Sequence, residues 1–283
     1  MKDESHYIIK SAHKLAEKGL VVIEDFTQFP IYDEPSLSPY LIIVLIHRGG
    51  LHVEYDFKSF TVGEHDFSLI YPNHVLKVTK PTDDYLSTMI VISPQFLTLL
   101  RKMFPNNYRF EYHFNHTMHL NDRQYEGLSS SFQLIKVISS LDKPERKEML
   151  VTLVDFMAHL TEIYMKENNV IIDDKSGAQQ LLQRFHTLIA GNYNKNREVR
   201  FYAQQLYLSP KYFGTVIRQA TGIGAREWIA LYVIVQAKHL LRHHRDMTIQ
   251  QISDRLGFSD QTAFGHYFKS HTGQTPQEYR EGK

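Results

Sequence analysis

The 283-residue sequence predicts a multi-domain α+β protein, made of an N-terminal β-barrel, a helical hairpin and an all-α C-terminal domain with two helix-turn-helix motifs. Three observations support this fold class. Short apolar runs of strand length occupy residues 20–92, helical periodicity begins at residue 121, and one spaced pattern occurs twice after residue 198. The expected boundaries are 1–120 for the barrel, 121–171 for the hairpin, 172–177 for a linker and 178–283 for the C-terminal domain.

Six short segments of the N-terminal part are rich in β-branched and aliphatic residues, as strands are. They are residues 20–23, 41–46, 51–55, 68–71, 75–79 and 87–92. Gly49-Gly50 stands between the second and third segments and indicates a tight turn. Several short strands at this spacing predict a barrel or a jelly roll. Ser93 and Pro94 then indicate the cap and the first position of a helix that extends to Phe104.

Residues 121–169 predict two antiparallel helices that are broken near Lys143-Pro144. Asn121 and Gln124 have the spacing of a capping box, in which each side chain binds the backbone amide of the other residue. Both helices carry apolar stripes, which could simply cover the barrel. Because the stripes exceed what one barrel face needs, we also expect a homodimer, held together by Leu128, Phe132, Ile135, Leu153, Phe156 and Leu160.

Residues 248–280 predict two short helices joined by a tight turn. Gly257 stands where a left-handed residue would end the first helix. We expect Ser259 to cap the second helix, whose buried stripe is Phe264 and Phe268. A helical hairpin that only fills a core would share this pattern. With one polar face left free, however, the pattern favours a helix-turn-helix motif, whose second helix enters the major groove of DNA.

The same pattern occurs about 50 residues earlier. An offset of 50 aligns Val199, Tyr202, Leu206 and Ser209 with Ile249, Ile252, Leu256 and Ser259, and an offset of 51 aligns Phe213 and Ile217 with Phe264 and Phe268. Between the two copies, residues 225–243 predict one helix of about 28 Å at about 1.5 Å per residue. That length is close to the ~34 Å between successive major grooves on one face of DNA.

Further spaced residues accompany the two motifs. They are Ala237-x-x-Leu240-Leu241, Gly257-Phe258, Phe264-x-x-x-Phe268-Lys269 and Gly273-x-Thr275-Pro276-x-x-Tyr279-Arg280. Together, over residues 180–282, they resemble the AraC/XylS transcription regulators. Val233, Ser253 and His266 depart from that pattern, because the family usually has arginine, alanine and arginine there. Residues 63–74 more loosely resemble the turn, strand and proline corner of cupin-like barrels, which many of these regulators carry. The resemblance implies a sequence-specific transcription regulator with a cupin-like sensing domain. It favours activation, although the residues leave activation or repression open.

The second helix of each motif leaves a polar face once the core has taken its apolar positions. The residues expected to face DNA are Lys211, Tyr212, Gly214, Thr215 and Arg218 in the first motif, and Gln261, Thr262, Gly265, His266 and Lys269 in the second. Gln261 suits adenine, Thr262 suits a thymine methyl group, and His266 can donate to guanine. The lysines and the arginine are expected to contact phosphates, which sets register and not sequence.

Charge is unevenly spread along the chain, although the net charge is only +1. Residues 178–283 carry 14 Lys and Arg against 7 Asp and Glu, whereas residues 1–177 carry 18 against 24. A basic C-terminal domain suits a phosphate-rich partner. Double-stranded promoter DNA is therefore the expected partner, and RNA polymerase is a further candidate.

The chain contains no cysteine, so disulfides, thiolate metal sites and a cysteine nucleophile are excluded. The N-terminus is too polar for a signal peptide, and the longest apolar run, residues 41–46, is far shorter than a membrane span. We expect a cytoplasmic protein that has no membrane contact and no cofactor. Any small effector is unidentified, and the barrel of residues 20–92 is where it would sit.

A barrel enzyme with a DNA-tethering domain is the alternative from another class. Histidines lie near two predicted hairpins, at His47, His52, His65 and His74, but the His-x-His motif of metal cupins is absent. His113, His116 and His119 are spaced by three in an extended segment, where neighbouring members point to opposite faces. We therefore predict neither a metal site nor an enzyme. An architectural DNA-binding protein is a third hypothesis, whose affinity would hardly depend on DNA sequence.

Overall fold

The computed structural model describes residue 15 and residues 18–24, 35–72, 74–79, 81–104, 117–170 and 177–282. The chain divides into two compact units. The N-terminal unit consists of residues 1–34, 38–54 and 59–174, and the C-terminal unit of residues 35–37, 55–58 and 175–283. Most of the predicted linker, residues 172–176, lies outside the described residues. No helix of the described part is both long enough and apolar enough to span a membrane.

The larger sheet of the N-terminal unit is antiparallel in each of its described pairings. Its strand order is β1-β8-β3-β6-β9, with the bounds Leu20–Ile23, Leu86–Ile92, Leu41–Arg48, Asp66–Ile70 and Thr117–His119. The central strand β3 is buried over its first six residues because it has a strand on each side and side chains packed on both faces. Ile43 lies opposite Ile90 on β8 and Leu69 on β6, so aliphatic side chains stack across three strands.

A second sheet has the order β2-β7-β4-β5, with the bounds Ser36–Leu37, Val75–Val78, Leu51–Tyr55 and Lys58–Val62. Strand β5 was not predicted, because its sequence KSFTV is mostly polar and the strand is largely exposed. The strands of the described chain thus form two open sheets, so the predicted barrel is not closed. Gly49, with φ of 69°, makes the predicted turn between β3 and β4.

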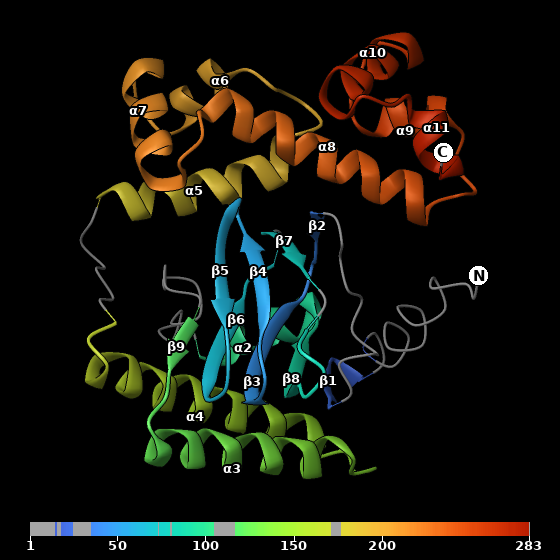
Figure 1. Ribbon diagram of the computed structural model, residues 1–283. Coiled ribbons are helices and arrows are strands. Elements are labelled where there is room, and N and C mark those ends of the chain that lie inside the picture. The colour runs from blue at the N-terminus through green and yellow to red at the C-terminus, as the bar shows by residue number, and fades with distance from the viewer. Residues whose placement is uncertain are drawn as a thin grey trace. The chain divides into compact units, whose positions relative to one another are not determined.

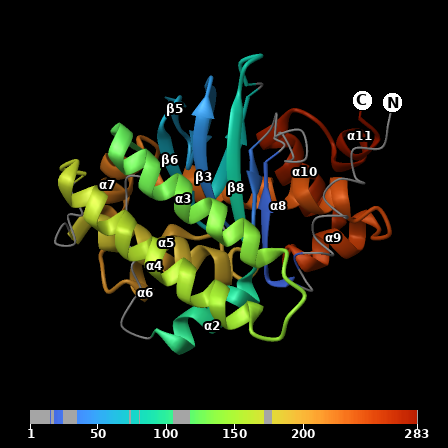
Figure 2. The ribbon, with the colours of Figure 1, turned by 90° about the horizontal axis from the view of Figure 1, so that it is seen from below.

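The described part of the N-terminal unit includes the helices α2 (Pro94–Met103), α3 (Asp122–Ser139) and α4 (Arg146–Glu167). Ser93 caps α2 by accepting a hydrogen bond from the amide of Phe96, as its sequence predicts. The predicted capping box of α3 is also present, with Asn121 and Gln124 each binding the other's amide. Helices α3 and α4 lie across one face of the larger sheet (Figures 1 and 2).

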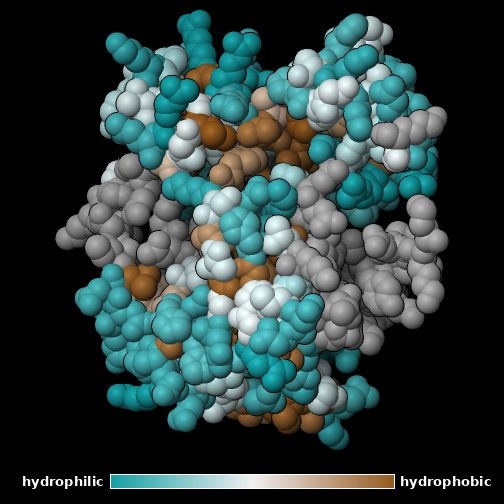
Figure 3. Space-filling model, in the orientation of Figure 1, coloured by the Kyte–Doolittle hydropathy of each residue, from teal (hydrophilic) through white to brown (hydrophobic). Residues whose placement is uncertain are grey.

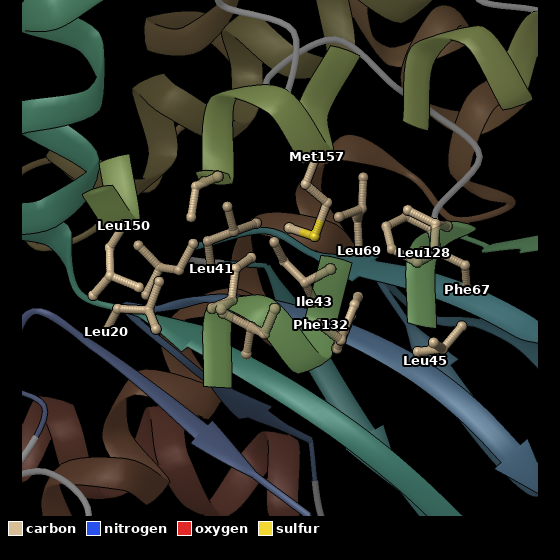
Figure 4. Packing of buried hydrophobic residues seen from close by; sticks show 14 of the residues in the cluster. Leu20, Leu41, Ile43, Leu45, Phe67, Leu69, Leu128, Phe132, Leu150 and Met157 are labelled. Atoms are coloured by element: carbon tan, nitrogen blue, oxygen red, sulfur yellow. The ribbon is translucent and has the colours of Figure 1, made fainter. Parts of the chain in front are cut away.

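The sheet and the helical hairpin share one hydrophobic core. Figure 4 shows side chains of the sheet and of both helices pointing toward one another, among them Ile43, Phe67 and Met157. Leu128, Phe132 and Ile135 of α3 lie in this core and are at most 1% exposed. These three residues were expected at a dimer contact. The structure instead places them against the sheet of their own chain, where burial of each contributes about 1.5–3 kcal/mol.

The outer face of the hairpin remains apolar. Helix α4 presents Phe156, which is 56% exposed, together with Leu153 and Leu160, which are half-buried. Large apolar side chains are also exposed at Leu134, Val137, Leu141, Met149 and Ile163. We call these eight residues the outer stripe. A patch of hydrophobic surface is visible at the lower edge of the molecule, over the hairpin (Figure 3).

The C-terminal unit contains seven described helices. They are α5 (Gly177–Asn192), α6 (Val199–Gln205), α7 (Pro210–Thr221), α8 (Ala225–His243), α9 (Ile249–Arg255), α10 (Gln261–Thr272) and α11 (Pro276–Glu281). Helices α6 and α7 form the first predicted motif, and α9 and α10 form the second. The long helix α8 connects them and has the bounds predicted from the sequence (Figure 1).

Candidate nucleic-acid interface

The first motif places α7 as its second helix. Ser209 caps α7 by accepting a hydrogen bond of 3.2 Å from the amide of Tyr212, and Pro210 follows at the first helical position. The helix ends at Gly222, whose φ of 83° is left-handed. Phe213 and Ile217 are fully buried, which confirms that this stripe faces the core.

The second motif places α10 as its second helix, but its cap differs from the prediction. Asp260 is the N-cap, and its carboxylate accepts a hydrogen bond of 2.7 Å from the amide of Ala263. Ser259, the expected cap, lies one residue too early and donates to the Asp260 carboxylate at 3.1 Å. The hydrogen bond from Ala263, followed by that from Ser259, holds the pKa of Asp260 below its ordinary value. The negative charge also suits the positive end of the helix dipole.

Ser253, which replaces the alanine usual in the resembling family, has a structural role. It is fully buried in α9, and its hydroxyl donates to the carbonyl of Asp260 at 2.8 Å. This hydrogen bond crosses the turn of the second motif. It therefore helps to set the angle between α9 and α10, and it satisfies a polar group that burial would otherwise penalise.

Each motif has a core of its own. In the first, the ring of Phe185 on α5 makes edge contacts with Tyr202, Phe213 and Trp228, at 5.1 to 5.6 Å between ring centroids. In the second, aliphatic residues of α8 and α9 surround the rings of α10, in a cluster of Ile234, Ala237, Leu240, Leu241, Ile252, Leu256, Phe264 and Phe268. Because buried aromatic side chains of α7 and α10 lie in these cores, the polar faces of the two second helices point away from them.

The residues predicted to face DNA all lie on the outside of α7 and α10. The exposed ones are Lys211, Tyr212, Thr215, Arg218, Gln261, Thr262, His266 and Lys269, and the two half-buried ones are Gly214 and Gly265. A Cβ atom added at either glycine would meet nothing within 4 Å, so both glycines border open space. The outer surface of these helices is mainly hydrophilic (Figure 3). Each face therefore offers amide, hydroxyl and basic groups beside a backbone that a partner can approach closely.

Some histidines of the enzyme hypothesis have structural partners in the N-terminal unit. The two ring nitrogens of His47 lie 2.8 Å from the Tyr125 hydroxyl and 2.7 Å from the Thr88 hydroxyl, which ties α3 to the sheet. His65 stacks on the same tyrosine ring at 4.1 Å, and His119 pairs with Asp66 at 2.9 Å. His113 and His116 lie outside the described residues.

Known proteins are similar to this chain over its C-terminal unit or over most of its length. A family model described as a helix-turn-helix domain matches residues 202–282. The arabinose operon regulatory protein of Escherichia coli is 37% identical over 89 residues, which are 31% of this chain and 30% of that protein. The transcriptional activator RhaS of Escherichia coli is 23% identical over 250 residues, which are 86% of this chain and 85% of that protein. A crystal structure of ToxT from Vibrio cholerae aligns with 93% of this chain and 97% of that chain, at 16% identity and a TM-score of 0.49.

The matched residues run from α6 to the end of α11 and contain both motifs with their connecting helix. The chain carries an AraC-type DNA-binding domain. Each alignment with the first three curated relatives spans only part of that relative, between 26% and 39% of its length.

Two features of the AraC-type domain were not anticipated from the sequence. Tyr207 is 90% exposed and has a φ of 60°, at the position that Gly257 holds in the second motif. Arg197 lies between α5 and α6, yet its side chain contacts the turn between α9 and α10. The repeat could have revealed the first of these features, because an offset of 50 pairs Tyr207 with Gly257.

Proposed function

We propose that this protein is a sequence-specific transcription regulator that binds promoter DNA through both motifs of its AraC-type domain. The observation that carries the proposal is the repeated architecture of α7 and α10. Each helix buries its apolar stripe and leaves a face of basic, amide and hydroxyl side chains exposed. Such a face is what a recognition helix presents to base edges and phosphates in the major groove.

Side chains of the two helices would contact DNA bases and phosphates in different ways. On α10, Gln261 would form paired hydrogen bonds with adenine, and Thr262 would contact a thymine methyl group. His266, where an arginine is usual, would read guanine with a weaker donor. The basic residues of both faces, Lys211, Arg218 and Lys269, would hold phosphates and fix the register. Tyr212 and Thr215 would supply further contacts on α7.

The protein would be cytoplasmic, in the same compartment as the DNA. Its N-terminal unit would control DNA binding. We propose that it has a sensing role for a small effector of unassigned chemistry, and that it forms a homodimer through the outer stripe of α3 and α4. A dimer would bring two AraC-type domains to one promoter and raise the effective concentration of the second after the first has bound. RhaS is named an activator, and we propose activation here as well, through contact with RNA polymerase.

Selection of DNA by the full chain tests the proposal directly. Random-sequence duplexes would be equilibrated with the protein, and the bound fraction sequenced over several rounds. We expect enrichment of one bipartite sequence, with affinity at least 1000-fold above that for random DNA at the same salt concentration. Genome-wide mapping of bound sites should then recover the same sequence upstream of genes. Equal binding to all duplexes would favour an architectural protein, and no binding would refute the proposal.

A further inference from the structure

The loop between α5 and α6, residues 193–198, is fixed to the first motif. The amides of Lys195 and Asn196 donate to the carbonyl of Asn192 at 2.8 and 2.9 Å, which extends the end of α5. The hydroxyl of Tyr202, a fully buried residue of α6, donates to the carbonyl of Asn196 at 2.8 Å. The position of the loop is therefore set by residues on both sides of it.

The same loop lies on the turn between α9 and α10 of the second motif. Arg197 donates from Nη2 to the carbonyl of Leu256, where the end of α9 leaves carbonyls without a helical partner. Its guanidinium carbon also lies 3.7 Å from the centre of the Phe258 ring. Gly257 has a φ of 71°, and a Cβ atom there would overlap the carbonyl oxygen of Asn194. The backbone of the loop and the backbone of the turn are thus in direct contact.

This contact is not a general requirement of the motif. At the matching turn of the first motif, Tyr207 carries a full side chain that is 90% exposed, so nothing covers that turn. A side chain is accommodated at one turn and excluded at the other, although the two turns share a left-handed backbone. The difference is that the 193–198 loop lies against Gly257, whereas the side chain of Tyr207 is exposed.

A second connection matters because α8 alone would leave the spacing of the two recognition helices poorly fixed. A swing of about 10° at one end of a rod of about 28 Å moves its other end by about 5 Å. Successive bases along one strand are ~3.4 Å apart. A swing of that size would therefore move the second recognition helix past more than one base pair.

We propose that the 193–198 loop is a brace that joins the two motifs into one rigid unit, with Arg197 as its positioning residue. The brace would fix the number of base pairs that the protein accepts between its two half-sites. Arg197 acts through α9 and α10 and does not need to touch DNA. The inference rests on the proposed DNA-binding function for its consequence, but the rigidity itself can be measured without DNA.

The rigidity can be tested in the full chain with spin labels. The sequence has no cysteine, so Gln219→Cys on α7 and Ser270→Cys on α10, both at exposed positions, give a unique labelled pair. We expect one narrow distribution of label distances with Arg197 present, and a distribution at least twice as wide in the Arg197→Ala variant. Lys195→Ala removes an equal charge from an exposed position of the same loop, and should leave the distribution narrow.

The consequence for DNA is tested on the duplex selected by the wild-type protein, with one base pair inserted or deleted between its half-sites. The wild-type protein should lose at least tenfold in affinity for each single change. Arg197→Ala should bind the parent duplex about tenfold more weakly and differ by less than threefold among spacings. Its affinity for a single half-site and its salt dependence should stay the same. Lys195→Ala should keep the wild-type spacing profile.

The proposal is overturned if Arg197→Ala keeps both the narrow distance distribution and the wild-type spacing profile. It is also overturned if that variant weakens binding equally at all spacings and on a single half-site. Should Arg197→Ala fail to fold, Phe258→Leu removes the ring under the guanidinium while keeping an apolar side chain, and the same two outcomes apply. If the wild-type protein selects no duplex, the proposed function fails, whereas the spin-label result still decides whether the brace exists.

Discussion

Tyr207 and Gly257 occupy the same position in the two copies of the motif, and their φ angles of 60° and 71° are both left-handed. A non-glycine residue pays about 1–2 kcal/mol for that conformation. Tyr207 gains nothing in return from packing, since 90% of it is exposed. Both positions therefore have a left-handed backbone, but Tyr207 is exposed, whereas Gly257 lies against Asn194.

Substitutions at these two positions should differ in their effect on stability. Tyr207→Gly should leave the C-terminal unit as stable as before or raise its stability by up to about 1 kcal/mol, because relief of the left-handed strain exceeds the extra chain entropy of glycine. Gly257→Ala should lower stability by more than about 1 kcal/mol, because the new Cβ meets the Asn194 carbonyl as well as a strained φ. Urea unfolding followed by Trp228, the single tryptophan and a fully buried residue of this unit, measures both. Equal losses in the two variants would contradict the explanation.

Two exposed residues of α10 should separate base reading from phosphate anchoring. Gln261→Ala should cost about 1–3 kcal/mol on the selected site and relax preference at one base pair. Lys269→Ala should weaken binding to all sequences about equally and reduce the salt slope by about one unit. Titrations at several salt concentrations, on the selected duplex and its single-base variants, check both. Unchanged affinity, preference and slope in the two variants would show that the recognition face is assigned wrongly.

At the scale of the element, the start of α10 depends on Asp260. Asp260→Ala should lower the melting temperature by a few degrees, because the Ala263 amide loses its acceptor. Ser259→Ala should have a much smaller effect, since its hydroxyl only supports the carboxylate.

The effect of Asp260→Ala should also depend on pH. The folded-state pKa of Asp260 is depressed, so the carboxylate stabilises the fold above its unfolded pKa of about 3.9. That contribution is lost as the pH falls through the folded-state pKa. The melting temperatures of the wild type and of Asp260→Ala should therefore converge below pH 4, and a constant difference down to pH 2 would argue against the cap.

Two substitutions in the α3–α4 hairpin should have different effects, one on the proposed homodimer and the other on the fold. Phe156→Glu should give a folded monomer if the outer stripe holds a homodimer, because a charge cannot remain unpaired in an apolar interface. Phe132→Glu should instead destabilise the fold itself, because Phe132 is only 1% exposed in the core. Sedimentation velocity together with circular dichroism distinguishes the two variants. A wild-type protein that sediments as a monomer at micromolar concentration would refute the dimer.

Elements with a strong periodic signal could be predicted from the sequence. Helix α8 has the predicted bounds, and the caps at Ser93, Asn121 and Ser209 are as expected, because capping depends on a few neighbouring residues. The cap of α10 was misassigned by one residue, since Ser259 and Asp260 are both good caps in adjacent positions. Strand β5 carries little apolar signal and could not be found. Which face of the α3–α4 hairpin meets the sheet also could not be found, because both faces are apolar.

At the scale of the whole molecule, we predict a cleavable connection between the two units. The motive is the composition of residues 172–177, Ile-Asp-Asp-Lys-Ser-Gly, and the division of the chain near residue 174. Limited proteolysis should release a basic fragment of roughly 105 residues, because segments of small and polar residues between compact units are preferred sites of cleavage. Mass spectrometry would identify the fragment, and a DNA-shift assay would show whether it still binds. Cleavage mainly inside 180–280 would count against the prediction.

The shared core of the sheet and the hairpin has a consequence for where the gene can be divided. A fragment that ends at residue 120 would expose the sheet face that Leu128, Phe132, Val154 and Met157 cover, and the excised hairpin would have no surface on which to bury those side chains. Neither piece should accumulate as soluble protein when expressed alone. When both pieces are expressed together from separate genes, they should bind each other and restore the folded N-terminal unit, because each piece supplies the apolar surface that the other must bury.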